Sequence, residues 1–139
     1  MIKTTQAHQK GQGNDDTRQA LLAAARKLFA EHGYHNVGVR DFAAAAGLTR
    51  GALYYYFPDK ESVFLAVLDS IQKKRIAEAA ARHRAPDRPD LWTEFRRDIQ
   101  IALDDAFDRE IQRILFIDGP AVLGWARWRE LDTQYGLGV

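Results

Sequence analysis

The sequence of 139 residues, 46% of them hydrophobic, is long enough for one domain or for two small domains that share a helix. It has no cysteine, which excludes disulfides and thiolate metal sites, and no apolar run approaches the roughly 18 residues of a membrane span. The net charge is only +1, but residues 1–60 hold eight Lys and Arg against five Asp and Glu, a bias that suits phosphate binding and also occurs on many solvated surfaces. The N-terminus lacks an apolar signal core, so we expect a cytoplasmic protein with no membrane partner.

The N-terminal segment, residues 1–14, is almost free of apolar side chains, which predicts a flexible arm. Its lysines, Lys3 and Lys10, either reach DNA phosphates or a minor groove, or are simply solvated. A glutamine three residues after Asp16 resembles a capping box, so we expect the first helix to run from Asp16 to about His32. The apolar stripe of this helix comprises Leu21, Leu22, Ala25, Leu28 and Phe29.

Two short helices around a tight turn are predicted next. The first covers residues 39–46 and ends at Gly47, because glycine adopts a left-handed conformation without a Cβ clash. Thr49 is placed to cap the second, over residues 50–56, and Pro58 closes it. A helix, a short glycine turn and a helix form the pattern of a helix-turn-helix unit, whose second helix enters the DNA major groove.

A long fourth helix is predicted from Lys60 to about His83, because apolar residues recur at helical spacing along it. Pro86 and Pro89 then mark a short linker. One helix therefore belongs to both halves of the chain. It either transmits a tilt to the DNA-reading helices or simply packs in the core.

Three further helices are predicted after the linker. Asp90 can cap a fifth helix over residues 91–108. A sixth covers residues 110–118, and Gly119 followed by proline indicates a cap and the first turn of a seventh helix, which runs to about Tyr135. No segment alternates like a strand, so the expected fold is all-α.

Residues 17–68 resemble the DNA-binding domain of the tetracycline-repressor (TetR) family of transcriptional regulators. The matching pieces are ALLAAARKLFAEHGY at 20–34, VRDFAAAAGLTRGALYYYF at 39–57 and Lys60-Glu61, in order and at matching spacing. The resemblance implies a three-helix DNA-binding domain over residues 15–60, joined by the fourth helix to a helical ligand-binding and dimerisation domain over residues 61–139. It also implies double-stranded DNA, a small-molecule effector and a second copy of the chain as partners, and no cofactor.

The side chains of the second short helix have the chemistry to read DNA. Arg50, in its first turn, can pair bidentately with guanine O6 and N7. Thr49 can donate to a phosphate or a base edge, Gly51 permits close backbone approach, and Ala52 can meet a thymine methyl group. Arg40, on the preceding helix, can reach a phosphate or a base.

The resemblance assigns further contacts. Tyr54 and Tyr56 match the family's pair of aromatic residues that donate hydroxyls to phosphate, although histidine is common at the second place, and Tyr55 between them is placed to touch bases. Lys60 matches the family's phosphate-binding lysine, whose charge adds to the helix dipole. Tyr54 and Leu53 have the alternative of filling the core. We expect that role for Leu53 only.

Two departures from the family pattern stand out. Val37-Gly38 replaces the usual Thr or Ser before the first short helix, so one phosphate contact is expected to be absent. The sequence also ends at Val139, before the two helices that usually complete the dimer interface. We therefore expect a partial regulatory domain, or a dimer formed through what remains.

In the family, the second half encloses a small-molecule pocket. The aromatic and aliphatic candidates for its lining have the alternative of ordinary core packing; they are Trp92, Phe95, Ile99, Leu103, Phe107, Phe116, Trp125 and Trp128.

The sequence bears on three classes of function. The preferred one is a ligand-responsive repressor that binds a palindromic operator as a homodimer, and the alternative is a truncated interaction module that does not bind DNA on its own. An enzyme is not expected, because there is no phosphate loop, nucleophile–base pair or metal-ligand cluster. The His32 and His35 pair is interpreted as a solvated loop, and the carboxylates are interpreted as solvated surface, namely Asp104, Asp105, Asp108 and Asp118.

Overall fold

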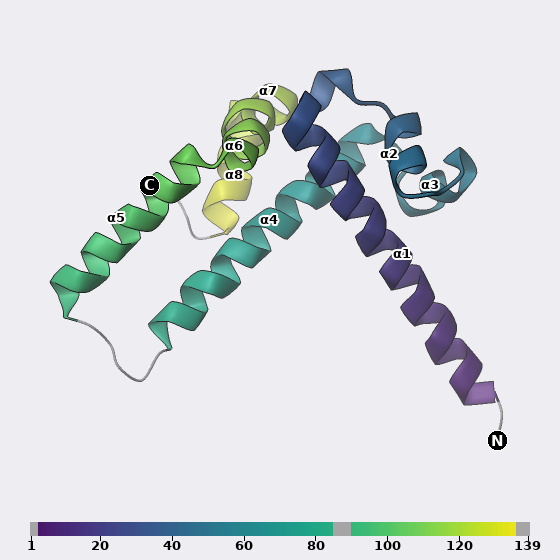
Figure 1. Ribbon diagram of the computed structural model, residues 1–139, viewed down its shortest axis with the longest axis horizontal. Coiled ribbons are helices and arrows are strands. Elements are labelled where there is room, and N and C mark those ends of the chain that lie inside the picture. Colours follow the sequence, from purple (N-terminus) through teal and green to yellow (C-terminus); the bar gives the residue numbers. More distant parts are fainter. Residues whose placement is uncertain (1–2, 85–89, 136–139) are drawn as a thin grey trace. The chain divides into compact units, whose positions relative to one another are not determined.

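The computed structural model describes residues 3–84 and 90–135, and every regular element in these ranges is a helix, which confirms the all-α expectation (Figure 1). The chain divides into two compact units, residues 1–67 and 68–139. No helix of the described residues is long and apolar enough to cross a membrane.

The first unit is a small helical domain around an aromatic core. Its elements are α1 (Lys3–His32), the 3₁₀ turn η1 (Tyr34–Asn36), α2 (Val39–Ala45), α3 (Arg50–Tyr56) and the first part of α4 (Lys60–His83). The Phe29 ring lies at the centre, with centroid distances of 5.0 Å to Phe42 and 5.1 Å to Phe64, both in edge-to-face contact. Leu21 and Leu53, both fully buried, extend this core toward α1 and α3.

The turn between α2 and α3 follows from local backbone chemistry. Gly47 adopts a φ of +67°, the left-handed conformation that ends a helix. The Leu48 amide donates to the Ala43 carbonyl at 2.8 Å, and the Gly47 amide donates to the Ala44 carbonyl at 3.2 Å. These two bonds form a Schellman motif, so the last carbonyls of α2 are satisfied within the turn itself. The predicted helix-turn-helix pair is therefore confirmed.

Helix α1 begins at Lys3 rather than at Asp16, so both the irregular arm and the capping box at Asp16 were wrong. No proline interrupts this segment. The Thr17 hydroxyl donates to the Gly13 carbonyl at 2.8 Å, and the Tyr56 hydroxyl of α3 donates to the Asn14 side chain at 3.3 Å. A contact between elements 42 residues apart thus supports helix where composition predicted none.

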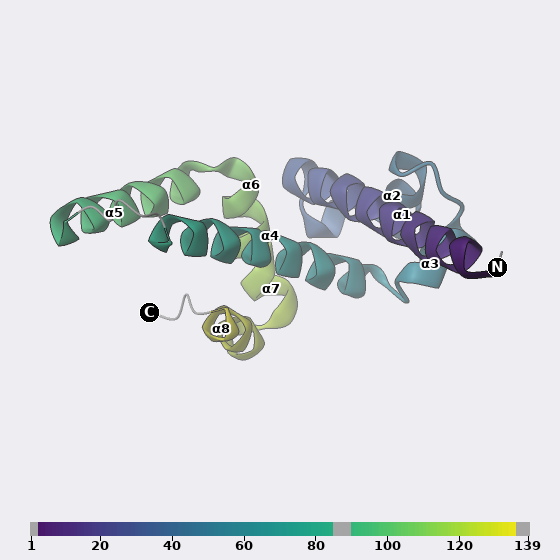
Figure 2. The same ribbon diagram turned by 90° about the horizontal axis from the view of Figure 1, so that it is seen from below.

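The second unit is built from the rest of α4 and five shorter helical segments. These are α5 (Leu91–Phe107), α6 (Arg109–Ile111), the π-helix η2 (Gln112–Asp118), α7 (Gly119–Leu123) and α8 (Trp125–Gln134). Helix α5 lies alongside the C-terminal part of α4 (Figures 1 and 2), and the Arg75 guanidinium joins the two helices by an ion pair with Asp105. The end of α8 is fastened to α4 by the Tyr135 hydroxyl, which donates to Asp69.

The last third of the chain differs from the expected pair of helices. The predicted sixth helix is largely a π-helix, and Gly119 is not a cap, because it continues that helix with a φ of −52°. The predicted seventh helix breaks at Gly124, where φ is +77°. The Trp128 indole N–H donates to the Leu115 carbonyl at 3.1 Å, a contact that requires the chain to turn between α7 and α8.

Candidate nucleic-acid interface

Helix α3 is fixed in the first unit by one face and one cap. Leu53 is fully buried, as predicted, and Phe57 just after the helix is 5% exposed. The Thr49 hydroxyl accepts the Ala52 amide hydrogen at 3.1 Å, which satisfies a donor of the first turn. Since Leu53 faces the core, its neighbours Gly51, Ala52, Tyr54 and Tyr55 lie on the sides and the outer face of α3.

The outward face of α3 carries the predicted base-reading residues. Arg50 and Gly51 are exposed, Tyr54 is 43% exposed and Tyr55 is 74% exposed. The Arg50 guanidinium lies 6.0 Å from the centroid of the Tyr54 ring, so the two side chains share one surface. A Cβ built on Gly51 would meet no atom within 4 Å, which leaves the backbone open to a close approach. Ala52 is only partly exposed.

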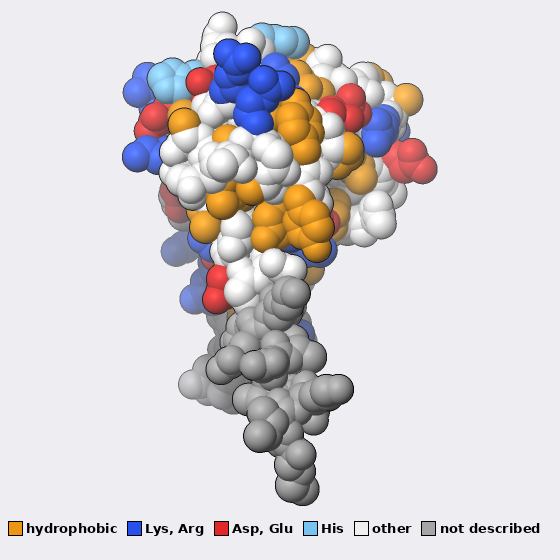
Figure 3. Space-filling model, turned by 90° about the vertical axis from the view of Figure 1, so that its right-hand side faces the viewer, with side chains coloured by type: hydrophobic (Ala, Val, Ile, Leu, Met, Phe, Trp, Pro, Cys, Tyr) orange, Lys and Arg blue, Asp and Glu red, His pale blue; other side chains and the backbone are white. Residues whose placement is uncertain are grey.

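Figure 3 views the side of the molecule on which α2 and α3 lie in Figure 1. Lys and Arg side chains (blue) gather there beside side chains of the hydrophobic class (orange). Arg40 of α2 is exposed, so it is available to a ligand outside the protein. As expected from the sequence, the N-cap Gly38 offers no hydroxyl; its amide instead donates to the Asp41 carboxylate at 2.7 Å.

Tyr56 is tied into the fold more closely than its neighbours. It is partly buried, its hydroxyl donates to Asn14, and its ring meets the Tyr55 ring edge-on at 5.2 Å. Asn14 was missed by the sequence reasoning because it lies in the segment that was expected to be an arm. Arg18 of the same helix sits 5.1 Å from the Phe57 ring centroid and covers the end of α3.

Lys60 has a partner within the protein. Its ammonium donates to the Tyr34 carbonyl at 3.0 Å and lies 4.2 Å from the centroid of the Tyr34 ring. An ammonium carries three donors, so the bond to Tyr34 leaves further donors for an external acceptor. Burial raises the pKa of the Tyr34 phenol, and the nearby Glu61 and Asp59 carboxylates raise it further. Asp59 caps α4 by accepting from the Ser62 hydroxyl and amide, which lowers the pKa of the Asp59 carboxyl.

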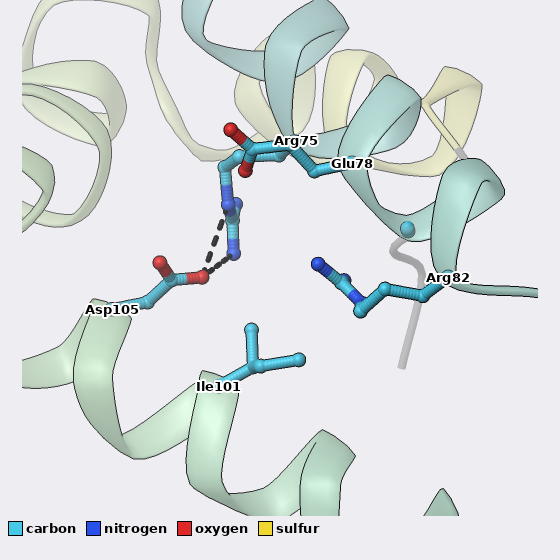
Figure 4. Close-up of a pocket in the computed structure, with 6 residues that line it drawn as sticks. Arg75, Glu78, Arg82, Ile101 and Asp105 are labelled. Carbon is cyan, nitrogen blue, oxygen red and sulfur yellow. Dashed lines mark hydrogen bonds and ion pairs between the residues drawn. The ribbon is translucent and has the colours of Figure 1, made fainter.

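Most of the candidate ligand-pocket residues are exposed. On α5, Trp92, Phe95 and Phe107 are 65%, 53% and 79% exposed. Ile99 and Leu103 on α5 are also exposed, as are Phe116 on η2 and Trp125 on α8. Trp128 is partly buried and stacks on Trp125 with a centroid distance of 5.2 Å. None of the eight lines the pocket between α4 and α5 that Figure 4 shows.

The carboxylates interpreted as solvated surface are not all solvated. Asp118 is only 6% exposed, and its carboxylate lies 3.6 Å from the Arg113 guanidinium, so that interpretation was wrong. Asp105 is paired with Arg75. Asp108 caps α6, because its carboxylate accepts the amide hydrogens of Glu110 and Ile111. Within residues 3–84 and 90–135, no group of three or more His, Cys, Asp or Glu could hold a metal ion.

Both halves of the chain match models of known protein families. Residues 21–67 match the profile described as "Bacterial regulatory proteins, tetR family", and residues 92–139 match "Tetracyclin repressor-like, C-terminal domain". The chain is 35% identical over 120 residues to the HTH-type transcriptional repressor AcnR of Corynebacterium glutamicum, a match that covers 78% of this chain and 60% of AcnR. It is 36% identical over 81 residues to the HTH-type transcriptional regulator EthR of Mycobacterium tuberculosis, covering 56% of this chain and 38% of EthR.

Solved structures agree with these matches. A TetR-family transcriptional regulator from Pectobacterium atrosepticum has a TM-score of 0.70 and 35% identity, covering 88% of this chain and 64% of that one. The multidrug binding protein EbrR, solved in complex with imidazole, has a TM-score of 0.65 and 25% identity, covering 89% and 65%. This chain spans 60% of the length of AcnR and 38% of the length of EthR.

Proposed function

Because this chain belongs to the tetR family of bacterial regulatory proteins, we propose that it is a DNA-binding transcriptional repressor that recognises a palindromic operator as a homodimer and responds to a small-molecule effector. In this proposal residues 15–60 bind DNA and residues 61–139 carry regulation. The matching relatives are named as transcriptional regulators or repressors, which favours a regulator over an enzyme.

One observation carries the proposal. Helix α3 buries Leu53 completely and turns Arg50, Tyr54 and Tyr55 outward on a single helix of the width that a major groove accepts. The Arg50 fork is suited to guanine, and the tyrosine hydroxyls are suited to phosphate oxygens. Arg40 and the remaining Lys60 donors would add backbone contacts on either side. The seven residues of α3 are too few for a long site, so a second copy would supply the other half-site.

Regulation by an effector is the family-level part of the proposal. A ligand releases DNA only if it binds the DNA-incompetent state more tightly than the competent one. EbrR, which shares this fold, was solved with imidazole, and this supports a small-molecule effector for the present chain as well.

The test is selection of binding sites from fragmented genomic DNA, followed by fluorescence anisotropy on the enriched sequence at several salt concentrations. We expect a palindrome, and binding that weakens steeply with salt. Arg50→Ala should weaken binding by roughly 10- to 100-fold and relax preference at one base pair. Arg129→Ala, an exposed arginine on α8, is the matched control and should bind like the wild type. Failure to enrich any sequence would refute the proposal.

A second candidate is an interaction module that pairs with another helical chain without reading DNA. It is favoured by the exposed apolar side chains of α5, among them Trp92 and Phe107. Size-exclusion chromatography with light scattering separates the two ideas when it is combined with the anisotropy assay. Dimers that show no salt-sensitive DNA affinity would favour the module, and DNA-bound dimers would favour the repressor.

A further inference from the structure

A pocket between α4 and α5 in the second unit is lined by charged and apolar side chains from both helices. Its lining comprises Arg75, Glu78, Ala79, Arg82, Ile101 and Asp105, and its volume is about 90 Å³ (Figure 4). We propose that this pocket binds a small aliphatic monocarboxylate, whose carboxylate pairs with Arg82 and whose alkyl chain lies against Ile101 and Ala79.

Most of the charge in the pocket is already neutralised. Arg75 donates to the same Asp105 oxygen through Nη2 at 2.5 Å and Nε at 3.1 Å, and Nη1 donates to Gln72 at 3.2 Å. Both members of this ion pair are about three-quarters buried, which keeps them fixed. Glu78 has its own cation, Lys74, at 3.9 Å. The pocket therefore has a rigid, neutral wall on the side of Arg75.

Arg82 is the charge that remains. It extends from α4, and its guanidinium points into the space between Arg75 and Ile101 (Figure 4). In the ranges that the structure describes, no carboxylate forms an ion pair with Arg82. A guanidinium is a planar fork of donors that matches the two oxygens of a carboxylate, and a pocket wall raises the strength of such a pair above that of a surface contact.

The size and charge of the pocket restrict the ligand. A cavity of about 150 Å³ holds benzene, so a pocket of about 90 Å³ suits a short alkyl chain better than a ring. Because Asp105 is paired with Arg75 and Glu78 with Lys74, Arg82 leaves the lining with one unpaired positive charge, which balances a monoanion but not a dianion such as phosphate. A monocarboxylate with an alkyl chain of two or three carbons therefore fits the lining best.

The experiment measures binding on the intact chain in the absence of DNA. Propionate is titrated by isothermal calorimetry at constant ionic strength, and propionamide, which has the same shape without the charge, is titrated in parallel. We expect saturable binding of propionate in the millimolar range and no binding of propionamide. Inorganic phosphate should bind at least about tenfold more weakly than propionate.

Two arginine variants locate the site. Arg82→Gln should weaken propionate binding by about tenfold or more, because it removes the charge-assisted hydrogen bonds. Arg97→Gln changes an exposed arginine of α5 that does not line the pocket, and it should leave the affinity unchanged. The proposal is overturned if propionate does not saturate, if propionamide binds equally well, or if Arg82→Gln binds like the wild type.

An effector role for this carboxylate rests on the proposed repressor function, but the binding itself does not. Adding propionate to the anisotropy assay tests the role separately. If the chain binds propionate and fails to bind any DNA, the repressor proposal fails and the pocket proposal stands. If it binds DNA and propionate does not saturate, the reverse holds.

Discussion

Gly119 in the second unit lies close against the Trp128 ring, and this makes a sharp prediction about substitution. A Cβ at this position would lie 2.9 Å from Cδ1 and from Nε1 of the Trp128 ring, and 3.2 Å from the Ile114 carbonyl oxygen. The indole cannot move away freely, because its N–H donates to the Leu115 carbonyl. Gly119→Ala must therefore displace the ring or the backbone of the π-helix.

The expected cost follows from three contributions. Alanine is favoured over glycine in a helix by about 1 kcal/mol. Against this, overpacking a tight contact costs about 1–3 kcal/mol, and losing the indole hydrogen bond costs about 1 kcal/mol more. The balance is a net destabilisation of about 1–3 kcal/mol, the opposite sign from an unconstrained Gly→Ala change in a helix.

The assay is urea unfolding followed by far-UV circular dichroism and by tryptophan fluorescence. All three tryptophans lie in residues 68–139, so fluorescence reports on the second unit alone. Gly13→Ala is the matched control, because Gly13 is helical and a Cβ there would meet no atom within 4 Å. We expect it to stabilise α1 by up to about 1 kcal/mol. A Gly119→Ala variant that is stabilised as much as Gly13→Ala would refute the packing argument.

Three further results are expected. Leu53→Ala removes a fully buried side chain and should lower the free energy of unfolding of the first unit by about 2–5 kcal/mol, measured by the urea midpoint in far-UV circular dichroism. The bond to Asp69 raises the pKa of Tyr135 to about 12, so the wild type should lose stability relative to Tyr135→Phe as the pH rises from about 10 to 12; equal losses in both proteins would contradict this. Hydrogen bonds from Thr93 lower the pKa of the Asp90 cap, so its contribution to folding stability is present above the unfolded pKa of about 4 and is lost as the pH falls below that value. In acid unfolding curves, the stability of Asp90→Asn should therefore fall less than that of the wild type over this range.

The elements that the sequence predicted best are those whose ends depend on local chemistry. Gly47 and Thr49 end α2 and begin α3 through bonds to residues within five positions, and both boundaries were correct to within one residue. Leu53 is buried and Arg50 is exposed, as expected from the apolar side chain of the one and the charge of the other. These features needed no knowledge of the rest of the fold.

The features that the sequence missed depend on partners far along the chain. The part of α1 that precedes Asp16 includes Asn14, which accepts a hydrogen bond from Tyr56. The break at Gly124 accompanies the return of Trp128 toward the π-helix. A glycine inside an apolar helical pattern has the same local appearance whether the helix continues or turns. The bond from Lys60 to Tyr34 likewise joins residues 26 positions apart, so spacing could not predict that the lysine has an internal acceptor.

The Thr49 hydroxyl at the start of α3 can accept one hydrogen bond and donate another at the same time. Its oxygen accepts the Ala52 amide hydrogen, while its own proton remains for an acceptor such as a phosphate oxygen. Serine shares this property, whereas aspartate caps a helix equally well but carries no proton and adds a negative charge. In a library with every amino acid at position 49, a selection for folding alone should retain Asp, Asn, Ser and Thr. A selection for DNA binding should in addition remove Asp. The spectrum of tolerated residues at one position thus separates what the helix requires from what a polyanion requires.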